Sequence, residues 1–200
     1  MTELVDRGDA VRLLKGGGVV AVPTDTVYGV AASLAHPRAV TRLFEIKRRP
    51  TTAALPILVD SLASIERLGV TWPERAERLS AAFWPGALTI VVAVPHQLAA
   101  LVGSTHDTAG FRIPNHELLR GVLIDVGPLA ASSANEHGEE PCRLASEVVG
   151  AFAGRDELDG VLDGAKGSGE VSTVIEVDGS SWRVLRQGAL SAEELAFALE

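Results

Sequence analysis

The stretch Val22-Pro23-Thr24-Asp25-Thr26-Val27-Tyr28-Gly29-Val30 places hydroxyls, a carboxylate and a glycine directly after an apolar run. Residues 19–22 have the composition of a short buried strand, and Pro23 has no N–H to continue a ladder. We therefore expect the strand to end at Pro23 and the polar residues after it to be exposed. Two interpretations stay open, because Thr24 and Asp25 either cap the next turn or contribute to a site.

Helical and strand patterns alternate along the rest of the chain. Helices are predicted over residues 4–15, 40–47, 60–68, 71–83 and 143–152 and from 191 onward, with starts at Asp60, at Thr71 with Glu74, and at Ser191 with Glu194. Strands are predicted over residues 55–59, 88–94, 109–113, 161–163, 173–177 and 182–185, and residues 118–126 are expected to form a helix and then a strand. The glycine-rich segment 164–170 is either a lid or a connection.

This order of elements lacks a strict βαβ rhythm. It predicts an α/β fold in which flanking helices cover a twisted mixed sheet, in one domain over residues 1–200. The single cysteine, Cys142, excludes an internal disulfide. No signal peptide or membrane-spanning run is visible, so we expect a cytoplasmic protein with no membrane partner.

The charge distribution favours a small anionic ligand over a nucleic acid. With 18 basic and 26 acidic residues, the net charge is −8, and aromatic residues make up only 4% of the chain. A noncatalytic RNA-binding module, which needs a basic groove with stacking aromatics, is therefore the less favoured alternative. Cations nevertheless gather between Arg38 and Arg49, which suits a polyphosphate, and Lys47 is placed near the buried side of its helix.

Several common sites are absent from the sequence. Glu170 stands where a Walker loop requires lysine, the five histidines lack the spacing of a zinc site, and Ser133 does not lie in a GxSxG elbow. No metal site is expected. Arg112 lies between apolar neighbours and, if buried, needs an anionic partner, which is either an internal acid or the carboxylate of a ligand.

Six segments in one order carry a family resemblance. Besides 22–30 they are Lys47-Arg48-Arg49-Pro50, Phe83-Trp84-Pro85-Gly86-Ala87-Leu88-Thr89, Gly110-Phe111-Arg112-Ile113-Pro114, Ser132-Ser133-Ala134-Asn135, and Ser172-Thr173-Val174 with Arg186-Gln187-Gly188. Together they resemble the YrdC-like family of threonylcarbamoyl-AMP synthases over about residues 10 to 190. The resemblance implies a YrdC-like fold with an open concave groove.

The resemblance also implies a reaction. L-Threonine and bicarbonate give a carbamate, which attacks the α phosphorus of ATP to release pyrophosphate and leave threonylcarbamoyl-AMP. The enzyme would be a nucleotidyltransferase that uses Mg²⁺ with ATP. A downstream threonylcarbamoyl transferase complex would use the product to modify tRNA, and the resemblance also allows a weak RNA contact. A YrdC-like paralogue with another substrate is the main alternative.

The resemblance assigns roles to individual residues. The catalytic pair is Lys47 and Arg49, which also contact ATP. The threonine side consists of Thr26, Arg112, Ala131 and Ser172. Further nucleotide contacts are Thr108, Ser133, Asn135 and Arg186.

This chain departs from the family pattern at several positions. Arg48, Ala53-Ala54 and His137-Gly138 replace the residues that are usual there, and Leu58 stands where some members place a histidine near threonine. The expected nucleotide contact at position 53 is therefore missing, which leaves affinity and substrate choice open.

Overall fold

The computed structural model describes residues 3–47, 54–135, 139–155, 157–179 and 181–199. Within these residues ten strands form one mixed sheet. From one edge to the other the strands are β1 (Leu4–Val5), β8 (Gly160–Leu162), β2 (Val19–Val22), β3 (Gly29–Ser33), β7 (Leu129–Ser133), β4 (Ile57–Leu58), β6 (Thr108–Arg112), β5 (Leu88–Ala93), β9 (Thr173–Asp178) and β10 (Ser181–Arg186). Parallel and antiparallel neighbours both occur, as predicted for a mixed sheet.

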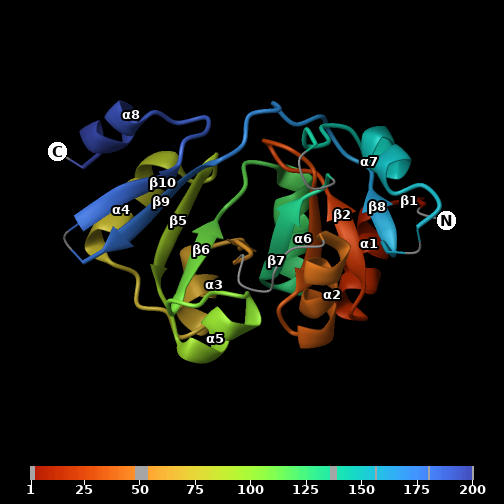
Figure 1. Ribbon diagram of the computed structural model, residues 1–200, viewed down its shortest axis with the longest axis horizontal. Coiled ribbons are helices and arrows are strands. Elements are labelled where there is room, and N and C mark those ends of the chain that lie inside the picture. Colours follow the sequence, from red (N-terminus) through yellow and green to blue (C-terminus); the bar gives the residue numbers. More distant parts are fainter. Residues whose placement is uncertain (1–2, 48–53, 136–138, 156, 180, 200) are drawn as a thin grey trace.

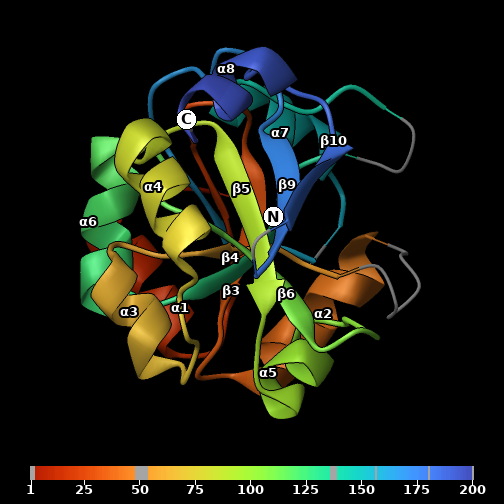
Figure 2. The same ribbon diagram turned by 90° about the vertical axis from the view of Figure 1, so that its left-hand side faces the viewer.

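Helices flank both halves of this sheet (Figures 1 and 2). The described helices are α1 (Arg7–Lys15), α2 (Pro37–Lys47), α3 (Leu62–Arg67), α4 (Glu74–Phe83), α5 (His96–Leu101), α6 (Glu117–Val126), α7 (Ala145–Ala151) and α8 (Ala192–Phe197). In Figure 1, α3, α4 and α5 accompany the half that contains β5 and β6, and α1, α2 and α6 accompany the half that contains β2 and β7. None of the described helices is long and apolar enough to cross a bilayer.

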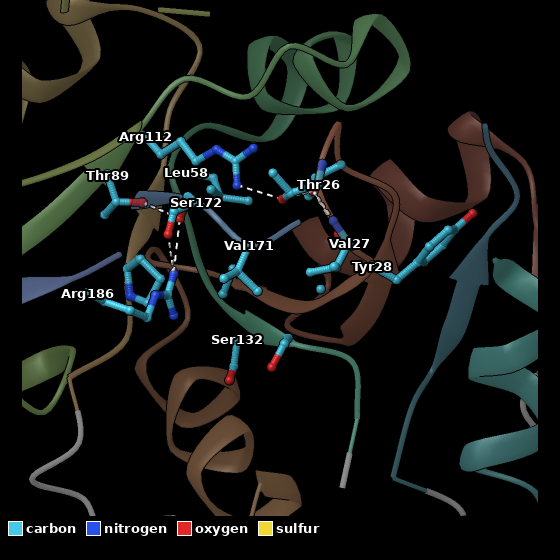
Figure 3. A pocket seen from close by; sticks show the side chains of 15 residues that line it. Thr26, Val27, Tyr28, Leu58, Thr89, Arg112, Ser132, Val171, Ser172 and Arg186 are labelled. Atoms are coloured by element: carbon cyan, nitrogen blue, oxygen red, sulfur yellow. Dashed lines mark hydrogen bonds between the residues drawn. The ribbon is translucent and has the colours of Figure 1, made fainter. Parts of the chain in front are cut away.

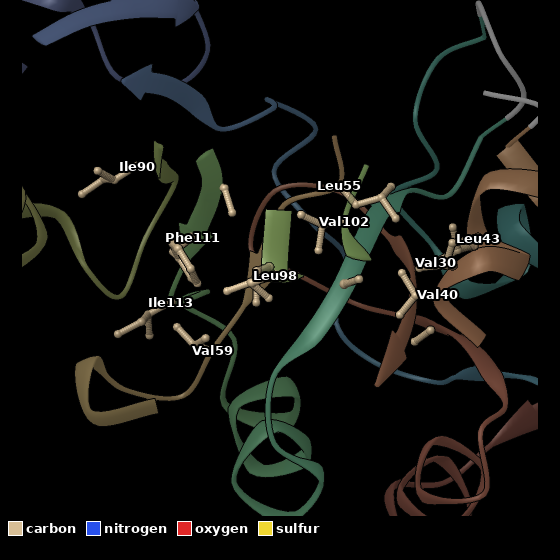
Figure 4. Packing of buried hydrophobic residues seen from close by; sticks show 14 of the residues in the cluster. Val30, Val40, Leu43, Leu55, Val59, Ile90, Leu98, Val102, Phe111 and Ile113 are labelled. Atoms are coloured by element: carbon tan, nitrogen blue, oxygen red, sulfur yellow. The ribbon is translucent and has the colours of Figure 1, made fainter. Parts of the chain in front are cut away.

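In the half of the sheet that contains β2 and β7, the strands separate two apolar clusters. Val20 and Val22 belong to the cluster that contains residues of α1 and α6, whereas Val19 and Ala21 belong to the larger cluster that contains residues of α2. Successive side chains of a strand point to opposite faces, so β2 contributes to both clusters. The larger cluster also extends under β5 and β6, where Ile90 and Phe111 pack (Figure 4).

Most predicted strands and helices are present, but several boundaries are wrong. Residues Leu4–Val5 form a strand on β8 instead of the first turn of a helix, because Asp6 caps α1 by accepting a hydrogen bond from the N–H of Asp9 at 2.9 Å. Residues 118–126 are all helical and belong to α6. The strand that was expected at the end of this range follows it instead, as β7.

The predicted helix caps had mixed outcomes. The Ser191–Glu194 capping box is confirmed, with the Ser191 Oγ accepting from the N–H of Glu194 at 3.2 Å. The box at Thr71 is wrong, since Pro73 is the N-cap of α4. Asp60 does not cap α3 directly; Ser61 precedes that helix, and the Asp60 carboxylate accepts from the hydroxyls of Ser61 and Ser64.

Candidate functional site

Strand ends and turns from both halves of the sheet surround a cavity of about 130 Å³ (Figure 3). Hydroxyl groups, apolar side chains and two arginines form its wall. The lining residues are Thr24, Thr26, Val27, Tyr28, Gly29, Pro56, Leu58, Thr89, Arg112, Ala131, Ser132, Ser133, Val171, Ser172 and Arg186. A concave site with a few converging polar groups is typical of small-molecule binding.

The turn between β2 and β3 is fixed by hydrogen bonds of its own. The Thr24 Oγ1 accepts from the N–H groups of Thr26 and Val27, both at 3.1 Å, and donates to the Val27 carbonyl at 2.7 Å. Because a hydroxyl has one hydrogen, the Thr26 hydroxyl is the donor in the 2.9 Å contact between the two threonines. Thr24 therefore caps the turn and also lines the cavity.

The expectation that these polar residues are exposed is wrong. Thr24 is 5% exposed and Thr26 is 3% exposed. The main chain of the later segment 164–170 bonds to this turn, since Ser168 N–H donates to the Asp25 carbonyl and Gly169 N–H donates to the Thr26 carbonyl. Segment 164–170 lies far from the turn in sequence, so the local pattern at Pro23 could not indicate that the turn is buried.

Arg112 ends β6 and is only 6% exposed. Its Nε donates to the Gly86 carbonyl at 2.8 Å, its Nη1 to the Thr26 Oγ1 at 2.9 Å, and its Nη2 to the Asp25 Oδ1 at 2.7 Å. Burial lowers the pKa of Arg112, and the charge of Asp25 opposes this shift. Among the described residues these contacts use one N–H of each terminal nitrogen, so a second N–H on each remains for a ligand.

A second polar group lies across the cavity, where β5 and β9 meet. The Thr89 and Ser172 hydroxyls are 2.9 Å apart. The Arg186 Nη2 donates to the Ser172 carbonyl at 2.9 Å and to its Oγ at 3.2 Å. Figure 3 shows Thr89, Ser172 and Arg186 grouped on one side of Val171, with Thr26 on the other. The C-terminal third of the chain thus contributes directly to the cavity.

Lys47 lies behind the Ser133 part of the wall. It is 4% exposed, and its Nζ donates to the Ser133 carbonyl at 2.7 Å, to the Asn135 Oδ1 at 3.0 Å and to the Asn135 carbonyl. The Ser133 Oγ donates to the same Asn135 Oδ1 at 2.5 Å. One amide oxygen therefore orients both an ammonium group and a hydroxyl.

The structure brings most of the predicted site residues together. Six of them line the cavity: Thr26, Arg112, Ala131, Ser133, Ser172 and Arg186. Lys47 and Asn135 join them through Ser133. Thr108 does not line the cavity; it is paired with Ala93 at the opposite end of β6 from Arg112. Arg49, with Arg48, Ala53 and His137, lies outside the described residues.

Several lining residues were not predicted. Tyr28 is fully buried and its hydroxyl donates toward the carbonyls of Leu162 and Gly164, at 3.2 and 3.3 Å. Thr89 ends the 83–89 segment of the family resemblance and lies in a predicted strand, but no site role was assigned to it. Apolar wall residues such as Val27 and Val171 resemble any core residue in the sequence, so only the fold identifies them.

The described residues contain no group of three or more His, Cys, Asp or Glu side chains placed to hold a metal ion.

Comparisons with known proteins agree with this fold. Residues 12–188 match the model of the Sua5/YciO/YrdC family, described as telomere recombination. A Mycobacterium leprae protein, provisionally named a threonylcarbamoyl-AMP synthase, is 40% identical over 192 residues, which cover 95% of this chain and 86% of that protein. The threonylcarbamoyl-AMP synthase of Pseudomonas savastanoi is 33% identical over 181 residues, covering 90% of this chain and 95% of the relative.

Solved structures lead to the same family. Pyrococcus abyssi Sua5, solved in complex with L-threonine, is 34% identical and has a TM-score of 0.87, over 100% of this chain and 59% of the Sua5 chain. This chain therefore spans somewhat more than half the length of that Sua5 protein. The family match and the relatives that are matched over most of their own length show that this chain belongs to the Sua5/YciO/YrdC family.

Proposed function

We propose that this protein synthesises L-threonylcarbamoyl-AMP from L-threonine, bicarbonate and ATP, with release of pyrophosphate. It would then be a nucleotidyltransferase whose product is used by a downstream threonylcarbamoyl transferase complex to modify tRNA. The observation that carries the proposal is Arg112, a buried guanidinium at the cavity wall with one N–H on each terminal nitrogen available for a ligand carboxylate. The relatives' names and the threonine complex of P. abyssi Sua5 support the choice of substrate.

The amino acid would bind between the two polar groups of the cavity. Its carboxylate would accept hydrogen bonds from Arg112, and Asp25 would keep the guanidinium in the required orientation through the 2.7 Å ion pair. The cavity wall also includes the apolar side chains of Val27, Leu58 and Ala131, which suit the methyl group of threonine. Ser172, on the far side, would supply a hydroxyl to the same substrate.

ATP would bind on the side of Lys47 and Arg186, with Arg49 as a further phosphate contact. Lys47 directs hydrogen bonds at three protein oxygens, those of the Ser133 and Asn135 carbonyls and the Asn135 amide. An ammonium group has three hydrogens, so a phosphate oxygen would have to replace one of these acceptors. We propose that the 133–135 segment thereby senses nucleotide binding.

The chemistry needs no protein nucleophile. The carbamate of threonine attacks the α phosphorus, and the P–O bond to the leaving pyrophosphate breaks. This chain's residues would hold the carbamate in line with the phosphate, and Lys47, Arg49 and Arg186 would offset the negative charge that develops on the leaving group. The magnesium ion that accompanies ATP would neutralise part of the same charge.

Product identification tests the proposal. Purified protein is incubated with ATP, L-threonine and carbon-13 bicarbonate, and the reaction is followed by mass spectrometry. We expect an adenylate that contains both threonine and the labelled carbon. An adenylate formed equally well with another amino acid would favour a paralogue with a different substrate, and no adenylate at all would contradict the proposal.

A further inference from the structure

The segment Gly164–Glu170, which connects β8 to β9, bonds through its main chain to the turn that carries Thr26. Ser168 N–H donates to the Asp25 carbonyl at 3.0 Å, and Gly169 N–H donates to the Thr26 carbonyl at 2.8 Å. Most side chains of the segment are exposed, whereas Gly167 is buried. The segment therefore holds the turn through its backbone.

Gly167 makes the closest approach to the turn. A Cβ atom at this position would lie 2.3 Å from the Thr26 carbonyl oxygen and 2.7 Å from the carbonyl carbon. Both of these atoms belong to the backbone and have little freedom to move aside. Any side chain at position 167 would therefore separate the segment from the Thr26 peptide.

Arg143 holds the segment from the other side. Its Nη2 donates to the Ser168 carbonyl at 2.8 Å, and its own carbonyl accepts from Gly167 N–H at 3.2 Å. Its side chain also packs on Gly169, where an added Cβ would lie 2.7 Å from the Arg143 Nε. Gly169 has a φ of +95°, which favours glycine. Arg143 does not line the cavity.

The turn that carries Thr26 orients Arg112, the anion-binding group of the cavity. Asp25 and Thr26 accept two of the three hydrogen bonds that fix Arg112, at 2.7 and 2.9 Å. A shift of the turn by a fraction of an ångström would therefore rotate the Arg112 guanidinium, and errors of this size at a binding group reduce activity.

We propose that Arg143 and Gly167 are positioning residues for the amino-acid substrate, acting on Arg112 through the Thr26 turn. This inference rests on the proposed function, because it takes the ligand of Arg112 to be threonine. The hydrogen bonds described for Lys47 run to Ser133 and Asn135, on another part of the cavity wall, so the effect should fall on threonine and leave the KM for ATP near its wild-type value.

Steady-state kinetics of three variants test the role. Arg143→Met and Gly167→Ala should each raise the KM for threonine by about tenfold or more, with the KM for ATP changed by less than about twofold. Arg143→Lys should recover part of the loss, since only one N–H of the arginine bonds to Ser168. A purely structural role would not produce this separation of the two KM values.

Matched controls make the result interpretable. Arg12→Met removes an arginine with a side chain that is 72% exposed, and Gly150→Ala adds a methyl group in α7 where no atom beyond the adjacent residues and the helix's own backbone lies within 4 Å. Neither should change either KM. If Gly167→Ala does not fold, the Arg143 pair decides the question.

The possible failures are distinguishable. Calorimetry first measures L-threonine binding to the wild-type protein in the presence of ATP. If wild type neither binds threonine nor releases pyrophosphate, the proposed function fails and the positioning role fails with it. If wild type is active but the Arg143 variants keep the wild-type KM for threonine, or lose threonine and ATP binding equally, only the positioning role is overturned.

Discussion

Arg112 combines a buried positive charge with a fixed orientation, and the structure pairs it with the internal acid Asp25. That pairing was one of two interpretations open from the sequence, and it does not exclude the other, since an arginine has five N–H donors. We predict that Arg112→Lys raises the KM for threonine by about tenfold to a hundredfold, because lysine cannot replace a two-donor fork. The KM for ATP should stay near its wild-type value in the same assay.

Thermal melting is the control for this variant. A folded Arg112→Lys protein with an unchanged KM for threonine would show that Arg112 serves only the ion pair with Asp25.

Tyr28 is the only tyrosine of the chain, so a tyrosinate signal reports the ionisation of this residue alone. Burial raises its pKa from 10.0 to about 12, and the negative charge of Asp163 adds to this shift. The unfolded chain releases this proton at lower pH than the folded protein, so the free energy of unfolding should fall as the pH rises from 10 toward 12.

Two measurements check the Tyr28 prediction. Tyrosinate absorbance of the native protein should titrate near pH 12, and urea unfolding should show a smaller loss of stability over pH 10–12 in Tyr28→Phe than in wild type. Titration of the native protein near pH 10 would contradict a buried phenol.

At the scale of elements, helix α2 delivers Lys47 from its last turn to the Ser133–Asn135 segment. We predict that Lys47→Ala loses about 2 to 4 kcal/mol of transition-state stabilisation, or roughly thirtyfold to a thousandfold in kcat/KM. Arg38→Ala, an exposed position on the same helix, should change kcat/KM by less than about twofold.

The outcome separates a local role from a diffuse one. If the two variants lose equal activity, Lys47 acts only through the general positive charge of α2.

Helix α6 begins at His116, whose Nδ1 accepts from the N–H of Leu119 at 3.4 Å. Burial lowers the pKa of His116, while the charge of Asp25 opposes the shift. A histidine with a depressed pKa in the folded state stabilises the fold above its unfolded pKa of about 6.5, and this contribution is lost as the pH falls.

We therefore predict that wild type loses more stability than His116→Asn between pH 7.5 and pH 5, since asparagine caps a helix without titrating. Urea unfolding at both pH values measures the difference. An equal loss in the two proteins would show that His116 does not contribute to the acid sensitivity.

Individual elements show which features of the fold could be predicted from the sequence and which could not. Runs of one type, such as residues 19–22 and the helix that ends at Lys47, were predicted because their patterns are local. Strand β3, Gly29–Ser33, was missed because its small residues carry no alternation, and its position depends on pairing with β2 and β7. Burial of Thr26 depends on residues 164–170, which no local pattern connects to it.

Over the whole molecule, residues from Thr24 to Arg186 converge on one cavity because the sheet order places β9 and β10 beside β5, far from their sequence neighbour β8. A chain with net charge −8 thus places Arg112 and Arg186 at its wall and Lys47 behind it. Such a local concentration of positive charge suits anionic substrates, such as a carboxylate and a polyphosphate.

The most direct test of the account is the dependence of pyrophosphate release on the other two substrates. Purified protein with Mg²⁺ and ATP is assayed with threonine and bicarbonate together, with each alone, and with neither, in buffers freed of dissolved carbon dioxide. We predict rapid release only when both are present, because their carbamate is the attacking group. Release at the same rate from ATP alone would contradict the account.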